Sequence, residues 1–394
     1  MSIKHLSLLF VLINLIACSQ NKKQNGGSSD EYSLVPTKEY ASFEVPSDVK
    51  LYMKTLHLYT DPATKKEYLT FQNVAEHEIL VYDWDTKKKI NKILFEKEGP
   101  NGVGRFHGYI MKSFDEIYLA EAMRPVISVM DSTGKLIKRI HYPKTTDGTR
   151  IMPSNSSTLR YTTFEIIGNK IYITQKLNRD FGRYTVEKSK VSAVIDTLTK
   201  ENKLLPLNFP IILTTEEMQT HTVGNEFAYS RAFDGEKFIY SFSYDEKIYV
   251  ANVAHDDIQR IPAKSRYITS PEKVGKVPGI IDMTKKICEL PMYGNLIYDK
   301  YRKVYYRFVF HEETFSADEE DFSELWQMGR NKFSIIILDE DFKCVGETEF
   351  PTGIYSIWAF FIREDGLYLS TSHYKNPTFS DDVLQFERIE LKKK

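Results

Sequence analysis

One pattern recurs six times along the chain and restricts the folds that it can adopt. Each copy is a polar turn followed by a tyrosine beside apolar residues, as in Gly168–Ile173 and Asp365–Leu369. The six tyrosines are Tyr68, Tyr118, Tyr172, Tyr240, Tyr305 and Tyr368, separated by 50, 54, 68, 65 and 63 residues. Repeats of this period are typical of propellers, solenoids and other arrays.

Each unit continues with two more apolar segments that have the length of strands. Examples are 79–83 followed by 90–95, and 126–130 followed by 136–141, with aspartate or glycine at the reversals. The chain holds 25 Tyr and 24 Phe, and helical periodicity is nearly absent, which favours half-buried strands. With an apolar segment opening each unit, four antiparallel strands form one propeller blade. Units of about 57 residues from residue 51 onward predict six blades.

The last unit is one strand short, and an unassigned strand lies near the start of the chain. The last unit offers 354–363, 367–372 and 384–391, and the surplus strand is 39–45. Pairing of 39–45 with 384–391 would close the ring and remove two open sheet edges. We therefore predict an all-β, six-bladed propeller over residues 38–394, closed by an N-terminal strand. Two β-sandwich domains are the alternative, but no linker separates two halves.

The N-terminus has the pattern of a bacterial lipoprotein signal. Lys4 precedes an apolar run over 6–17, which is too short to span a bilayer, and Ala17 stands before Cys18. This pattern predicts a signal peptide over 1–17 and lipidation of Cys18, so that acyl chains attach the protein to a membrane. The alternative is an ordinary secretory signal followed by an unrelated cysteine. The polar segment that follows predicts a flexible tether over 18–37.

The segment Glu98–Phe106 looks like the glycine–proline turn that precedes a blade in NHL-type six-bladed propellers. The lipoprotein signal, the polar tether and the six aromatic blades together resemble an uncharacterised family of Bacteroidota-type propeller lipoproteins. This resemblance implies the fold and a cell-envelope location, and it brings no established activity. No acidic run follows Cys18, which by family analogy favours the outer membrane on its periplasmic side.

Composition argues against several classes of partner and cofactor. Lys+Arg number 53 and Asp+Glu 54, so the net charge of −1 provides no general field to attract nucleic acid. Apart from Cys18, the cysteines are Cys288 and Cys344, which form either a disulfide or two separate thiols. Neither a CxxC motif nor a Cys/His cluster is present, and we predict no metal and no cofactor.

The motifs that resemble catalytic sequences have simpler explanations. The glycines of 99–108 have neither of the two phosphate-loop spacings. His311–Glu313 lacks the second histidine of HExxH and precedes a predicted surface helix, with Ser316 and Glu319 spaced as a capping box. No GxSxG is present, and the sequence therefore predicts no catalytic residue.

A binding site is predicted where the segments leading into the innermost strands meet. These segments should converge at one mouth of the central channel, as concave ligand sites require. The predicted ligand-binding residues are Arg105, His107, His221, Tyr293 and Tyr355. The alternative for each is ordinary loop or strand packing.

The predicted function is a non-catalytic binding or scaffolding module for a small ligand, glycan, peptide or envelope partner. The alternative is a hydrolase or lyase acting on saccharides or peptides at the channel mouth, because propellers support both kinds of function.

Overall fold

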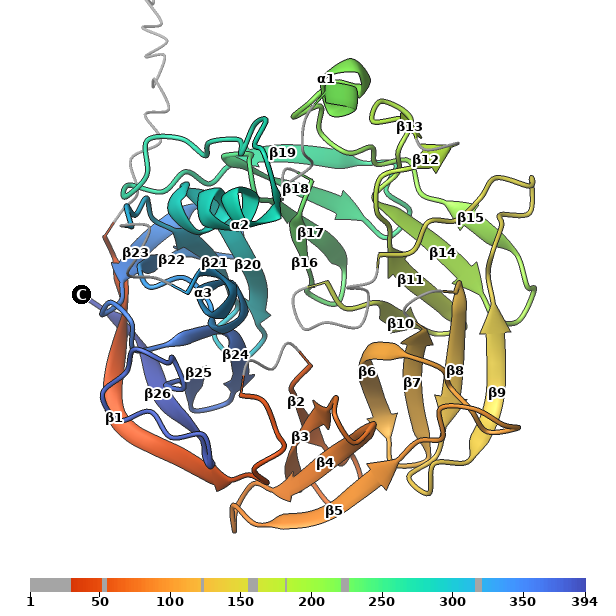
Figure 1. Ribbon diagram of the computed structural model, residues 1–394, viewed down its shortest axis with the longest axis horizontal. Coiled ribbons are helices and arrows are strands. Elements are labelled where there is room, and N and C mark those ends of the chain that lie inside the picture. The colour runs from red at the N-terminus through yellow and green to blue at the C-terminus, as the bar shows by residue number, and fades with distance from the viewer. Residues whose placement is uncertain are drawn as a thin grey trace, which may run out of the picture.

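Six four-stranded antiparallel sheets stand radially around a central axis, as the blades of a propeller (Figure 1). The computed structural model describes residues 30–51, 55–121, 124–154, 162–180, 183–220, 227–315 and 321–394. The predicted all-β, six-bladed propeller is confirmed. The predicted signal peptide, Cys18 and His221 lie outside the described residues.

The first three blades follow one another along the chain, each with its innermost strand first. Blade 1 contains β2 (His57–Thr60), β3 (Glu67–Asn73), β4 (Glu78–Asp83) and β5 (Lys89–Leu94). Blade 2 contains β6 (Phe106–Ser113), β7 (Glu116–Glu121), β8 (Val126–Met130) and β9 (Leu136–His141). Blade 3 contains β10 (Glu165–Ile167), β11 (Lys170–Thr174), β14 (Ser192–Asp196) and β15 (Asn202–Leu204), with a hairpin of β12 (Arg179–Asp180) and β13 (Arg183–Tyr184) inserted.

The next two blades repeat this order, and the sixth takes its outermost strand from the N-terminus. Blade 4 contains β16 (Tyr229–Phe233), β17 (Lys237–Phe242), β18 (Lys247–Asn252) and β19 (Ile258–Pro262). Blade 5 contains β20 (Met292–Asp299), β21 (Val304–Phe310), β22 (Phe333–Leu338) and β23 (Cys344–Glu349). Blade 6 contains β24 (Ser356–Arg363), β25 (Gly366–Ser370), β26 (Val383–Lys393) and β1 (Tyr32–Glu44).

The strand β1 closes the ring by pairing antiparallel with β26. The register runs from Tyr32 opposite Lys393 to Glu44 opposite Val383, with an irregularity between Pro36 and Tyr40. The predicted closure is confirmed, although β1 begins six residues before the predicted boundary at 38 and so includes part of the predicted tether. The backbone N–H of Leu34 donates to the Thr348 hydroxyl of blade 5, so β1 joins two blades.

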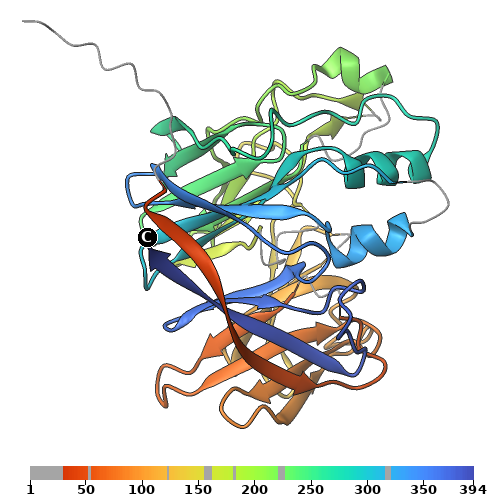
Figure 2. The same cartoon turned by 90° about the vertical axis from the view of Figure 1, so that its left-hand side faces the viewer.

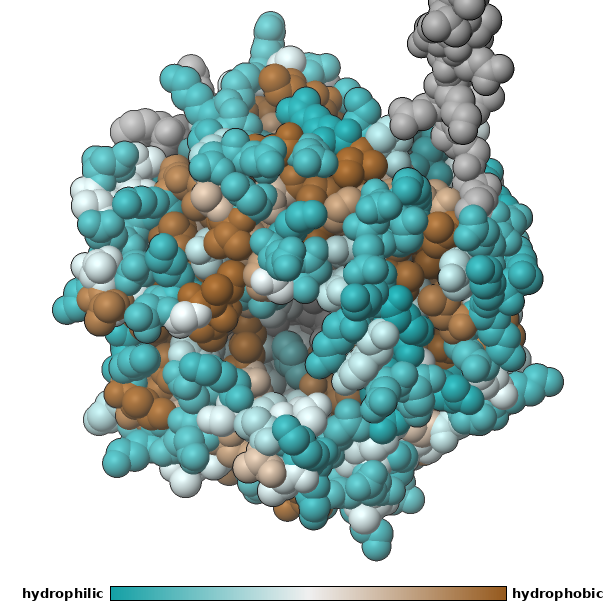
Figure 3. All heavy atoms as spheres, turned by 180° about the vertical axis from the view of Figure 1, so that it is seen from behind, coloured by the Kyte–Doolittle hydropathy of each residue, from teal (hydrophilic) through white to brown (hydrophobic). Residues whose placement is uncertain are grey.

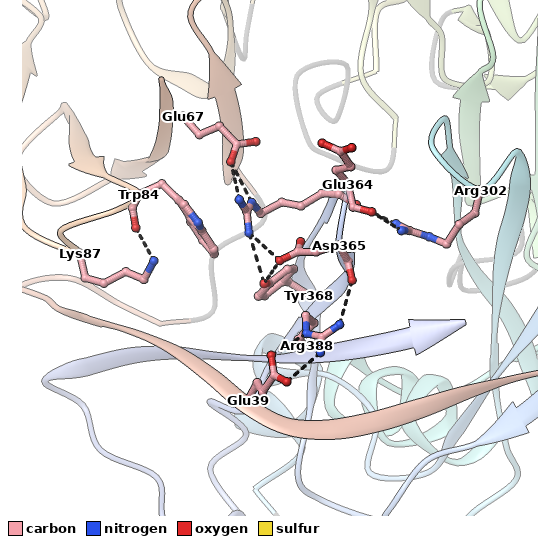
Figure 4. Close-up of polar contacts among 10 residues, drawn as sticks. Glu39, Glu67, Trp84, Lys87, Arg302, Glu364, Asp365, Tyr368 and Arg388 are labelled. Carbon is pink, nitrogen blue, oxygen red and sulfur yellow. Dashed lines mark hydrogen bonds and ion pairs between the residues drawn. The ribbon is translucent and has the colours of Figure 1, made fainter. Parts of the chain in front are cut away.

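Arginine side chains connect blades 5, 6 and 1 where the ring closes (Figure 4). Arg363 at the end of β24 binds the Glu67 carboxylate of blade 1 at 2.8 Å and stacks over the Trp84 ring at 4.4 Å. From blade 5, Arg302 donates to the carbonyl oxygens of Arg363 and Glu364 at 2.7 and 2.8 Å. These contacts join all three blades by side chains, in addition to the backbone pairing of β1.

Three short helices lie on one side of the ring (Figure 2). Helices α1 (Thr215–Thr220) and α2 (Ile280–Glu289) lie in the connections that lead into β16 and β20, and α3 (Phe322–Met328) joins β21 to β22. The Asp321 carboxylate caps α3 by accepting the N–H groups of Ser323 and Glu324. The helix predicted for this insertion therefore begins later than the predicted capping box, whose residues lie outside the described part.

Within the described ranges, no helix is both long and apolar enough to cross a membrane. Cys288 is buried, Cys344 is half-buried, and both are free thiols, so the disulfide alternative is excluded.

The closing strand makes a prediction about stability. Phe43 on β1 is 0% exposed and its ring contacts those of Tyr82, Trp84 and Phe386, whereas Tyr40 on the same strand is 52% exposed. We expect Phe43→Ala to lower the free energy of unfolding by about 3–5 kcal/mol, because a buried aromatic ring is lost. Tyr40→Ala should change it by about 0.5 kcal/mol or less. Urea unfolding measures both, and equal losses would contradict a locking role for β1.

Candidate functional site

A cavity of about 490 Å³ lies in the central channel and receives residues from all six blades. One lining residue from each innermost strand, in blade order, is Leu58, Ile110, Glu165, Arg231, Tyr298 and Ile362. Seen from the face opposite the helices, the surface is hollowed near its centre (Figure 3). The channel thus forms the kind of concave site in which small ligands bind.

In blades 2, 4, 5 and 6 the cavity lies toward the ends of the innermost strands, whereas in blades 1 and 3 it also contacts residues at or before the start of these short strands. Lys112 lies near the end of β6, Phe233 ends β16, Lys300 follows β20, and Ile362 lies one residue before the end of β24. Helices α1 and α2 precede innermost strands, so the cavity lies on the side of the ring away from the helices. The predicted ligand-binding residues precede or begin these strands, and none of them is among the described lining residues.

Two charged residues of the innermost strands, Glu165 and Arg231, occupy equivalent positions in adjacent blades. Each repeated tyrosine pairs across the sheet with one residue of the innermost strand; in blade order these residues are Tyr59, Ile110, Glu165, Arg231, Tyr298 and Phe361. Four of the six are apolar or aromatic, whereas the adjacent blades 3 and 4 carry a carboxylate and a guanidinium. Radial repetition therefore brings opposite charges to neighbouring walls of one channel.

The guanidinium of Arg231 is held in a fixed position between blades 3 and 4. Its Nη atoms donate to the Ser192 hydroxyl at 2.8 Å and to the carbonyl oxygens of Thr163 and Tyr172 at 2.6 and 2.8 Å. Arg231 is buried, and no described residue accepts a hydrogen bond from its Nε. The position of the Arg231 guanidinium is therefore fixed, and its Nε–H donor has no acceptor among the described residues.

The carboxyl group of Glu165 is enclosed by protein but has no polar partner of its own. It is half-buried because it faces the cavity, and no hydrogen bond or ion pair joins it to any described side chain. Enclosure disfavours the ionised form and raises the pKa of Glu165 to about 7, although the charge of Arg231 partly opposes this shift. A carboxyl group with this pKa changes charge near neutral pH.

Two of the predicted site residues are used by the fold itself. Tyr293 is 0% exposed, the Arg307 guanidinium stacks on its ring at 3.5 Å, and its hydroxyl oxygen accepts the Ser265 N–H. Tyr355 is 3% exposed, and its hydroxyl donates to the Glu387 carboxylate at 2.7 Å. Packing, the alternative weighed for each residue, accounts for both side chains.

The other three predicted site residues are placed less completely. Arg105 is exposed just before β6. His107 lies in β6, but its side chain and the whole of His221 lie outside the described part of the chain. Joint contact of the five residues with one ligand therefore stays a prediction.

The cavity combines ionisable and apolar lining residues. No group of three or more His, Cys, Asp or Glu side chains that could hold a metal ion occurs among the residues described. The cavity is lined by the Glu165 carboxyl group, the Arg231 guanidinium, the side chains of Lys112 and Lys300, and apolar side chains between them. Fold and cavity together define a six-bladed β-propeller with a ligand-sized channel site.

The chain belongs to the domain of unknown function family DUF4221, whose pattern matches residues 32–349. The crystal structure of a DUF4221 member from Bacteroides vulgatus is 25% identical, with a TM-score of 0.80, over 93% of this chain and 100% of that one. A predicted exported protein of Bacteroides fragilis is 10% identical, with a TM-score of 0.51, over 92% and 97% of the two chains, and shows the same fold. No curated protein matches the chain.

The raised pKa of Glu165 makes a prediction about stability. A carboxyl group whose pKa is higher in the folded state than in the unfolded state destabilises the fold as pH rises from about 4.5 to 7. Glu165→Gln should therefore match the parent protein near pH 4.5 and exceed its free energy of unfolding by about 3 kcal/mol at pH 8. Glu236→Gln, on an exposed turn, is the control and should show no such trend. A difference that is constant with pH would contradict the shifted pKa.

Proposed function

We propose that the protein is a non-catalytic binding module of the cell envelope whose ligand occupies the channel cavity. The observation that carries this proposal is the Glu165 carboxyl group, which lines a cavity of about 490 Å³ without a polar partner among the described residues. Buried polar groups are normally paired within the fold. A group left unpaired in an open cavity is therefore available to a ligand.

The alternative of a saccharide hydrolase receives less support from the cavity. Most glycosidases use two carboxyl groups that face each other across the scissile bond. Among the described lining residues, Glu165 is the one carboxylate. A hydrolase of this kind would need a second carboxyl group, which the described lining residues do not include.

An exported, lipid-anchored location completes the proposal. It is supported by the apolar run over 6–17 that ends before Cys18, and by the similarity to a predicted exported protein of Bacteroides fragilis. In this arrangement the acyl chains on Cys18 hold the propeller at a membrane.

Substitution of Cys18 tests the anchor. We expect Cys18→Ala to move the protein from the membrane pellet to the soluble fraction after cell lysis and ultracentrifugation, because it removes the acylated thiol. Ser19→Ala is the neighbouring control and should stay with the membrane. Undiminished membrane retention of Cys18→Ala would refute acylation.

A ligand screen on a blocked channel tests the binding site. Small-molecule hits are found by thermal shift, and Ile166→Trp then places a larger side chain in the cavity wall. We expect the shift to disappear in Ile166→Trp and to persist in Ile90→Trp, which makes the same change at an exposed position of blade 1.

The same screen separates the two ends of the channel. Loss of the shift in Arg105→Ala, with retention in Ile166→Trp, would place the ligand at the mouth predicted from sequence. A thermal shift that persists in Ile166→Trp, in Ile90→Trp and in Arg105→Ala would contradict a channel site.

A further inference from the structure

The ionisable groups around the channel cavity are mainly cationic, although the chain as a whole is close to neutral. Arg231, Lys112 and Lys300 line the cavity, and Glu165 is the one carboxyl group among the described lining residues. The net charge of the whole chain is −1. The excess of positive charge is therefore a local property of this site and favours an anionic ligand.

The cations occupy two levels of the site. Lys112 and Lys300 are exposed and belong to blades 2 and 5, which stand on opposite sides of a six-bladed ring. Lys112 also approaches Glu116 at 3.1 Å, but the Lys112 side chain is exposed and the Glu116 side chain is only half-buried, so the pair is weak. Arg231 is buried in blade 4, and it lines the same cavity as Glu165 of blade 3 and acts on it electrostatically. An anion would thus be attracted at the mouth and held deeper inside.

Apolar side chains lie between these charges and form part of the wall. Ile110, Ile166 and Ile362 come from blades 2, 3 and 6, and Phe233 comes from blade 4. Such a wall suits a hydrocarbon or aromatic body rather than a fully hydrated inorganic ion.

We propose that the cavity binds a small carboxylic acid, with its apolar body against the isoleucines and its carboxylate beside Glu165 and Arg231. This inference rests on the channel site proposed above and names its ligand class. Glu165 in its protonated form donates a hydrogen bond to the ligand carboxylate, so that two carboxyl groups share one proton. The fixed charge of Arg231 compensates the remaining negative charge.

Binding of this kind depends on pH in a defined direction. The pKa of Glu165 is raised to about 7, mainly by enclosure and against the opposing effect of Arg231. The other ionisable groups that line the cavity are His57 of blade 1, Lys112 of blade 2, and Tyr298 and Lys300 of blade 5. Above pH 7 the ionised Glu165 would place a second negative charge beside the ligand carboxylate, and the ligand would be released.

The test compares matched compounds that differ only in charge. Isothermal titration calorimetry is carried out at pH 6 and pH 8.5 with benzoate, phenylacetate and 3-phenylpropionate, their primary amides, and 2-phenylethylamine. We expect at least one carboxylate to bind at pH 6 more tightly than its amide and than the amine. Its affinity should fall about 30-fold at pH 8.5, in proportion to the protonated fraction of a group with a pKa of 7.

Two variants connect this behaviour to the named residues. Glu165→Gln keeps a hydrogen-bond donor but cannot ionise, so carboxylate binding should persist and lose its dependence on pH. The double variant with Lys112→Gln and Lys300→Gln should weaken carboxylate binding several-fold and leave amide binding unchanged.

The outcomes distinguish this inference from the proposal on which it rests. Tighter binding of the amides or the amine, abolished by Ile166→Trp, would overturn the carboxylate assignment and leave the channel site intact. Absence of carboxylate binding at pH 6 would likewise overturn the assignment. Carboxylate binding that survives Ile166→Trp would overturn the channel site itself.

Discussion

The pairing of β1 with β26 is the constraint on which the rest of the molecule depends. It brings together segments from the two ends of the described chain, Tyr32–Glu44 and Val383–Lys393, and converts a row of blades into a ring. In a closed ring every blade packs against two neighbours. The first and last blades therefore cannot separate and widen the channel. The innermost strands therefore stay at a fixed distance from the axis, and equivalent residues of successive blades face the same space.

Buried arginines add a second level of fixation between neighbouring blades. Arg307 of blade 5 donates to the Ser241 hydroxyl and to the carbonyl oxygens of Asp245, Glu246 and Ala263, all in blade 4 or the connection that leaves it. Arg231 does the same between blades 4 and 3. The planar guanidinium offers several donors in a rigid arrangement, so one side chain can bind several acceptors of the neighbouring blade. The charge beside the cavity is thus positioned by the same contacts that join the blades.

The repeat allowed the fold to be predicted, but not the site. All six repeated tyrosines lie on the second strand of a blade, and the strand near residue 40 closes the ring, because spacing and alternation fix both. Whether an innermost-strand residue faces the channel or the next blade depends on strand twist, so Tyr293 and Tyr355 could not be recognised as packing residues. A usable signal did exist: residues paired with the repeated tyrosines are apolar or aromatic in four blades and charged only at Glu165 and Arg231. Helix α2 was missed because it is short and buries only Ile287 and Cys288.

Glu165 differs from the other enclosed polar groups in what the fold gains from it. The Glu387 carboxylate accepts hydrogen bonds from Tyr355 and from the backbone N–H of Lys38, so it secures the closing strand. The Arg231 nitrogens hold blade 3 to blade 4. No described residue forms a hydrogen bond or ion pair with the Glu165 carboxyl group, and its enclosure disfavours ionisation, so the fold would be more stable at neutral pH without this carboxyl group. A group that weakens the structure that surrounds it is best explained by what enters the cavity beside it.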